Sequence, residues 1–296
     1  MPARESEALI LRTYPYREAD LIVSFFTRDQ GKLRGVAKAV RRPKSRFGSG
    51  LERLSYVRVF YFQKETQELV KLDRCERIGP PVFLRADYST MVALDFLAEV
   101  SEQLLPDHES NDAYFRLLVL VLNEMWTGLS GSENGSPRLS VASTAGLAAA
   151  QAVDADAAAA PRVPQGPDAL AEAGGSPGWL WRALTYFLLW AVRFGGWLPP
   201  LNVCIRTGTE LGPGEVAYFE RAQPGLFSAE YRHGNCWPMS AESRSIAAEM
   251  LKRPLPDLQE RRWSRQTAED LRRFLTQRLE AQFESRLKTA ALMAEL

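Results

Sequence analysis

Short segments rich in β-branched and aromatic residues, separated by turn residues, make up the first part of the chain. Such segments are typical of β-strands. The turn at Asp29-Gln30-Gly31 and an Arg-, Pro-, Ser- and Gly-rich loop at 41–50 separate some of them. The five predicted strands cover residues 8–14, 21–27, 33–38, 54–63 and 69–77. So many strands in so short a stretch indicate a small barrel.

After Pro80-Pro81 the apolar positions recur with a helical period. Asn111 is a good N-cap and opens the second of four predicted helices. These helices cover about 88–105, 111–126, 179–194 and 264 to the C-terminus. The predicted fold class is therefore α+β, with a five-stranded barrel domain at 1–80 and a mostly α-helical domain at 81–296.

The segment 131–178 interrupts the helical domain with an unusual composition. Ala, Gly, Ser and Pro supply 31 of its 48 residues, and it contains no aromatic residue. Such a composition buries too little apolar surface to offset the conformational entropy lost on ordering. We therefore expect a disordered or partly helical insertion without a functional role of its own.

The fourth predicted strand contains three consecutive aromatic residues, Phe60, Tyr61 and Phe62. Apolar and polar positions do not alternate cleanly here, so an aromatic face could lie outside the barrel and stack nucleobases. The alternative is that all three side chains simply pack the barrel.

Charge is distributed unevenly along a chain whose formal net charge is only +1. Residues 1–80 carry 17 Lys and Arg against 10 Asp and Glu, and nine basic residues between 31 and 58 face a single acid, Glu52. A dense, nearly acid-free run favours a polyanion as partner, with binding that weakens steeply as salt rises, although a merely solvated loop is the alternative. The predicted nucleic-acid contacts lie on the third strand and the loop after it: Lys32, Arg34, Lys38, Arg41, Arg42, Lys44 and Arg46.

Motifs for catalysis and for secretion are missing from the sequence. It has no phosphate-binding G-x-x-x-x-G-K-[ST] or G-x-G-x-x-G and no nucleophile G-x-S-x-G, and it has only two histidines, His108 and His233. We therefore expect a protein that is not an enzyme and needs no cofactor. Three cysteines, no secretory signal and no apolar stretch long enough to span a bilayer predict a cytoplasmic location.

A zinc-ribbon skeleton with missing ligands occupies 202–240. Two C-x-x-C knuckles hold zinc in such ribbons. Here Cys204 is followed by Thr207 and Cys236 by Met239, both poor Zn²⁺ ligands, which leaves Cys204, His233 and Cys236 as a degenerate remnant. We expect a metal-free hairpin held by apolar packing, with Trp197, Phe219, Phe227 and Trp237 as candidates.

In combination, several short motifs make this chain resemble the RecO family of bacterial recombination mediators along nearly its whole length. The matching pieces are ALIL at 8–11, YREAD at 16–20, GKLRGVAK at 31–38, the helical segments 94–105 and 111–122, and Gly196-x-x-Pro199-x-Leu201-x-x-Cys204. The degenerate Cys positions and the insertion depart from the family pattern.

The resemblance implies an N-terminal five-stranded barrel of the oligonucleotide-binding (OB) type followed by a helical domain. It also implies a role in RecF-pathway DNA repair and recombination. The implied activities are binding of single- and double-stranded DNA, annealing of strands coated by single-strand binding protein (SSB), and loading of RecA together with RecR. The implied partners are DNA, the SSB C-terminal tail and RecR, and the implied site of action is the nucleoid. Two alternatives remain open from the residues: an RNA- or ribosome-binding OB module, and a nucleic-acid-modifying enzyme.

Overall fold

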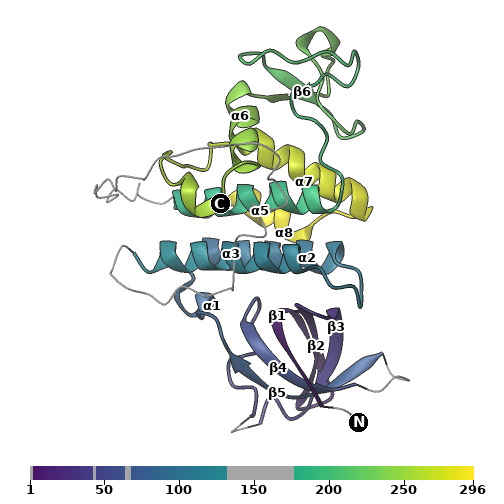
Figure 1. Cartoon of the computed structure of the whole chain (residues 1–296), viewed down its shortest axis with the longest axis vertical. Helices are drawn as coiled ribbons and strands as arrows, with labels where there is room; N and C mark the ends of the chain where they lie inside the picture. The colour runs from purple at the N-terminus through teal and green to yellow at the C-terminus, as the bar shows by residue number, and fades with distance from the viewer. Residues whose placement is uncertain (1–2, 43–44, 64–67, 132–176) are drawn as a thin grey trace, which may run out of the picture.

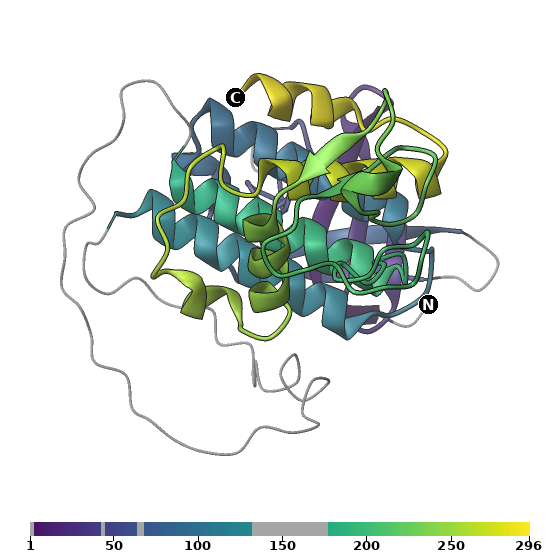
Figure 2. The ribbon, with the colours of Figure 1, turned by 90° about the horizontal axis from the view of Figure 1, so that it is seen from above.

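The computed structural model describes residues 3–42, 45–63, 68–131 and 177–296. A β-barrel lies at one end, a layer of helices α2 and α3 packs on it, and helices α5, α7 and α8 form the next layer (Figure 1). A small β6–β7 sheet lies at the opposite end, above the helices (Figure 2). The predicted insertion falls almost wholly outside the described residues, and so does Lys44.

The barrel is closed, and its strands are ordered β1-β2-β3-β5-β4. The prediction of a five-stranded barrel followed by helices is confirmed. Alternate side chains fill a small core inside it, including those of Ile10, Val23 and Leu33. The strands are β1(Ala3–Tyr16), β2(Asp20–Thr27), β3(Gly31–Ala37), β4(Tyr56–Phe62) and β5(Leu69–Arg77).

The helices pack around a second, larger hydrophobic core. Asn111 caps α3 as predicted, because its side chain accepts a hydrogen bond from the Tyr114 amide. The remaining elements are α1(Val82–Arg85), α2(Tyr88–Leu104), α3(Asp112–Leu129), α5(Gly178–Phe194), β6(Ala217–Phe219), β7(Trp237–Met239), α6(Ala241–Met250), α7(Glu269–Phe283) and α8(Lys288–Glu295). In the described part of the chain, no helix is both long enough and apolar enough to cross a membrane.

The prediction of one continuous helix from 264 to the C-terminus is wrong, because the structure has two helices there. Glu284 adopts a left-handed conformation with φ 51° and ends α7, so that α8 forms a separate helix. The Glu99 carboxylate on α2 accepts hydrogen bonds from the amides of Lys288 (3.0 Å) and Thr289 (2.9 Å). This tertiary cap satisfies the N-terminus of α8, and no local pattern predicts it.

Part of the barrel's outer face is buried against α2 and α3. Leu9, Phe26 and Tyr56 point outward from their strands and belong to the helical core. The Phe26 ring lies 5.6 Å from that of Phe115 on α3, and the Tyr56 ring lies 5.8 Å from the same ring. The barrel and the helices are therefore joined by an apolar interface rather than by a linker alone.

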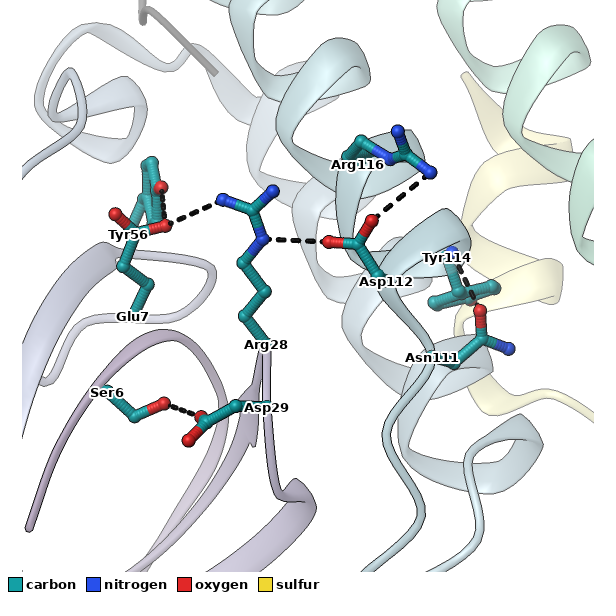
Figure 3. Close-up of polar contacts among 9 residues, drawn as sticks. All are labelled: Ser6, Glu7, Arg28, Asp29, Tyr56, Asn111, Asp112, Tyr114 and Arg116. Atoms are coloured by element: carbon teal, nitrogen blue, oxygen red, sulfur yellow. Dashed lines mark hydrogen bonds and ion pairs between the residues drawn. The ribbon is translucent and has the colours of Figure 1, made fainter. Parts of the chain in front are cut away.

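Arg28 joins the barrel to α3 at the edge of this interface (Figure 3). Its Nε donates a hydrogen bond to Asp112 Oδ1 at 2.7 Å, and its Nη1 lies 3.4 Å from the Glu7 carboxylate. The Glu7 carboxylate also accepts a hydrogen bond from the Tyr56 hydroxyl at 2.7 Å, and Arg116 pairs with Asp112 at 3.1 Å. The hydrogen bond to Asp112 raises the pKa of Arg28, so this cation is committed to the interface.

The β2–β3 turn is the tightest contact between the two parts. Gly31 has φ +75°, and a Cβ at this position would lie 2.2 Å from the backbone oxygen of Glu109. The next residue, Lys32, accepts a hydrogen bond on its carbonyl from the His108 amide at 3.0 Å. Only glycine fits this turn against the α2–α3 loop.

Replacing Gly31 by Ala should therefore lower the free energy of unfolding by about 2 kcal/mol or more, because left-handed strain and a backbone clash act together. Gly48→Ala is the matched control, since Gly48 also has positive φ (+49°) but open space around it. That variant should lose only about 1 kcal/mol. Urea unfolding of both proteins checks this, and equal losses would contradict the close contact.

Candidate nucleic-acid interface

The outer face of the barrel that the helices leave uncovered runs across four strands. Tyr14 is paired with Ile22, Ile22 with Val36, and Val36 with Lys71. Directly paired residues present their side chains on the same face of a sheet, so these four form a row on the outside. Because the second and third strands and the neighbouring loops carry the ligand in OB folds, this row is the candidate binding face.

Four aromatic rings on the uncovered outside of the barrel lie against cations. The guanidinium carbon of Arg12 lies 5.1 Å from the centroid of the Tyr14 ring. That of Arg17 lies 5.1 Å from the centroid of the Tyr16 ring. On β4 and β5, Lys71 lies 5.8 Å from the Phe62 ring and Arg74 lies 3.7 Å from the Phe60 ring. Such pairs combine a surface for base stacking with a charge for phosphate.

The three consecutive aromatic residues of β4 lie partly inside the barrel and partly on its outer face. Tyr61 is 1% exposed and packs the barrel core, where its ring centroid lies 6.2 Å from that of Phe25. Phe60 and Phe62 are half-buried on the outside, under Arg74 and Lys71.

The turn after β3 presents three of the predicted cations to solvent. Lys38, Arg41 and Arg42 are all exposed, and their side chains have no polar partner within the described ranges. The backbone of this turn is held against the β1–β2 turn, because the Ala39 amide donates to Asp20 Oδ1 at 2.8 Å. The backbone that carries these three cations is therefore fixed next to the β1–β2 turn, and the side chains themselves are free to contact a ligand.

Two further predicted cations are exposed but paired. The Arg46 side chain is 73% exposed and lies 2.8 Å from Asp73, and that of Arg34 is 50% exposed and lies 3.7 Å from Glu102. Solvent-exposed ion pairs contribute little stability, so a phosphate can compete for either side chain.

Lys32, in contrast, is turned into the protein. Its side chain is 8% exposed, and Nζ donates to the carbonyl of Glu102 at 2.8 Å and pairs with Asp107 at 3.3 Å. We leave Lys32 out of the proposed binding face because its ammonium group stabilises the barrel–helix interface.

Sequence reasoning did not select the cations and rings on β1 and in the β1–β2 turn. Arg12, Tyr14 and Tyr16 occupy alternate positions of one strand, and Arg17 follows them. Alternating aromatic and basic residues at the end of a strand would have been the signal.

The remnant ribbon does not fit a zinc ion. Cys204 is fully buried, and although burial itself raises the pKa of its thiol, hydrogen bonds from the Thr207 side chain and three backbone groups lower it to about 7. Met239, at one lost ligand position, lies in the helical core, and Cys236 contacts His233 instead. Among the residues described, no group of three or more His, Cys, Asp or Glu side chains is placed to hold a metal ion.

The purified protein should therefore contain no stoichiometric zinc, and a chelator should leave its melting temperature unchanged. Elemental analysis and thermal melts with and without EDTA measure this. About one zinc per chain, released together with a fall in melting temperature, would contradict the assignment.

Comparison with known proteins places these features in one family. The family model "Recombination protein O N terminal" matches residues 1–81, and "Recombination protein O C terminal" matches residues 169–291. The DNA repair protein RecO of Koribacter versatilis is 38% identical over 293 residues, which are 99% of this chain and 99% of that protein.

Other relatives match over a shorter region. The DNA repair protein RecO of Bifidobacterium animalis subsp. lactis is 39% identical over 127 residues, 42% of this chain and 52% of that protein. The DNA repair protein RecO of Thermodesulfovibrio yellowstonii is 38% identical over 117 residues, which are 40% of this chain and 46% of that protein. With a full-length match and both family models in the expected order, the chain belongs to the RecO family of DNA repair and recombination proteins.

Proposed function

We propose that this protein is a recombination mediator that binds single- and double-stranded DNA on its barrel and anneals complementary strands coated by SSB. Family membership supports a further role, the loading of RecA together with RecR on the nucleoid. The observation that carries the DNA-binding proposal is the uncovered barrel face, where cation–aromatic pairs lie beside the unpaired cations of the β3–β4 loop.

Annealing on such a surface needs no covalent chemistry. Two strands repel each other through their phosphates, and Lys38, Arg41 and Arg42 lower that repulsion when they replace condensed counterions. The tyrosine rings hold bases by stacking, which tolerates any sequence and leaves the Watson–Crick edges accessible. A second strand can therefore pair with bases that the first strand still presents.

Changing Lys38, Arg41 and Arg42 together to Ala should weaken single-strand binding for every sequence tested. It should also flatten the slope of log K against log salt by about 2 to 3, if each side chain makes one phosphate contact. Annealing of SSB-coated strands should slow in parallel. Fluorescence anisotropy with labelled oligonucleotides at several salt concentrations, together with an annealing assay without nucleotide or metal, measures both effects.

A triple variant of the helical domain provides the matched control. Lys252, Arg262 and Arg286 are exposed, and their side chains have no polar partner in the part of the chain that the structure describes. Their change to Ala removes the same charge and should leave the slope unchanged. An unaltered slope in the folded barrel variant would remove the three loop residues from the site, and a strong preference for RNA would favour the ribosomal alternative.

For the acidic SSB tail, which ends in Phe, we propose a groove beside α6. Its lining combines four apolar residues with two cations and two glutamates: Ile246, Met250, Leu258, Trp263, Arg253, Arg261, Glu249 and Glu260. Each cation is more than a third exposed and is shared with glutamates, since Arg253 lies 2.9 Å from Glu249 and Arg261 lies 2.8 Å from Glu242. A terminal carboxylate can displace such exposed pairs while the ring packs against the apolar residues of the lining.

Arg261→Glu should weaken binding of a tail peptide at least about tenfold, because the lining then repels the terminal carboxylate. The control is Arg262→Glu, one residue along the chain, where the side chain is exposed outside the groove lining. Titration of a fluorescent peptide with a free or an amidated C-terminus measures both. Equal effects of the two variants would contradict this location.

A further inference from the structure

The β6–β7 hairpin contains a linked set of three functional side chains. Cys236 Sγ lies 3.4 Å from Nδ1 of His233, and Nε2 of the same ring lies 3.5 Å from the Glu220 carboxylate. A thiol, an imidazole and a carboxylate thus follow one another in the order that activates a nucleophile in covalent catalysis.

The fold holds this arrangement from both strands of the hairpin. Phe219, the last residue of β6, pairs with Trp237, the first of β7, so Glu220 and Cys236 follow as neighbours just beyond that pair. The His233 ring is stacked on the buried Phe227 ring, with centroids 6.0 Å apart and planes 15° apart. Ring stacking and the strand register therefore fix the orientation of the imidazole.

The Glu220 carboxylate faces the ring nitrogen of His233 that lies away from the thiol, at 3.5 Å from Nε2. The Glu220 side chain is 16% exposed and also lies 3.6 Å from Arg206. A carboxylate in this place favours the tautomer with its proton on Nε2, and in that tautomer the lone pair on Nδ1 is directed toward Cys236. A proton can pass from Sγ to Nδ1, and the imidazolium that forms is stabilised by Glu220.

The other two cysteines lack this combination of access and activation. Cys204 is fully buried in the helical core. Cys75 lies in the barrel core and donates a hydrogen bond to the Phe47 carbonyl, and burial raises its pKa to about 11. Cys236 is partly exposed, and its thiol contacts a base.

We propose that Cys236 is a modification site at which hydroperoxides oxidise the thiol. The sulfur attacks one peroxide oxygen and forms an S–O bond as the O–O bond breaks. The sulfur is oxidised to a sulfenic acid, and the peroxide is reduced to water or, for an alkyl hydroperoxide, to the alcohol. The thiol proton moves to Nδ1 of His233 and then to the departing oxygen, so atoms and charge balance. This site is separate from the proposed DNA-binding face, because it lies on the hairpin at the far end of the molecule (Figure 1).

The test uses the full-length protein at pH 7 with two probes: iodoacetamide, which reports thiolate, and hydrogen peroxide followed by dimedone, which traps sulfenic acid. Peptide mass spectrometry assigns the modified residue. Cys236 should react first with both reagents. His233→Asn should slow its alkylation about tenfold, because the imidazole that accepts the thiol proton is then missing.

Two matched variants isolate the proposed contacts. His108→Asn changes the only other histidine and should leave the rate at Cys236 unchanged. Glu220→Gln should slow the reaction, whereas Glu230→Gln, at an exposed position in the same hairpin, should not. Circular dichroism confirms that each variant is folded. Faster reaction at Cys204 or Cys75, or a rate at Cys236 that does not depend on His233, would overturn the proposal.

Discussion

The docking of one side of the barrel onto α2 and α3 determines which of its residues are free to act. A closed barrel turns every second side chain outward, and each outward side chain must either pack against another element or face water. Leu9, Phe26 and Tyr56 meet the helices, whereas Tyr14 and Tyr16 remain on the open side. The proposed binding face is thus the part of the outer surface that the described helices leave uncovered.

The same docking divides the positive charge of the barrel into two groups. Arg28 and Lys32 lie at the interface, where carboxylates and carbonyls of the helical domain hold them. Lys38, Arg41 and Arg42 lie beyond the end of β3, where their side chains are exposed and have no polar partner among the described residues. Since a cation can stabilise the fold or bind phosphate but cannot fully do both, the position of α2 and α3 sets the extent of the proposed DNA surface.

Local signals predicted the barrel well, because strand boundaries and the Asn111 cap depend on neighbouring residues. They failed where the deciding partner is distant in sequence. Lys32 belongs to the same dense basic run as Lys38, and only the fold brings Glu102 and Asp107 to it. The break before α8 likewise depends on Glu99, which lies far away in the chain. The density of basic residues in the sequence predicts a positively charged surface. Packing then decides which of these basic side chains are exposed.

The β6–β7 hairpin keeps its shape through apolar packing. Its fold is kept by aromatic contacts, since the Phe219 ring lies 5.2 Å from that of Phe274 on α7 and 5.9 Å from that of Trp237. A zinc ion would hold every cysteine as a thiolate in one shared environment. Without that requirement the two cysteines have separate surroundings: Cys204 is enclosed by backbone donors, and Cys236 lies near the surface beside a base. Apolar packing therefore maintains the shape, and side chains that share no metal ion are free to differ in reactivity.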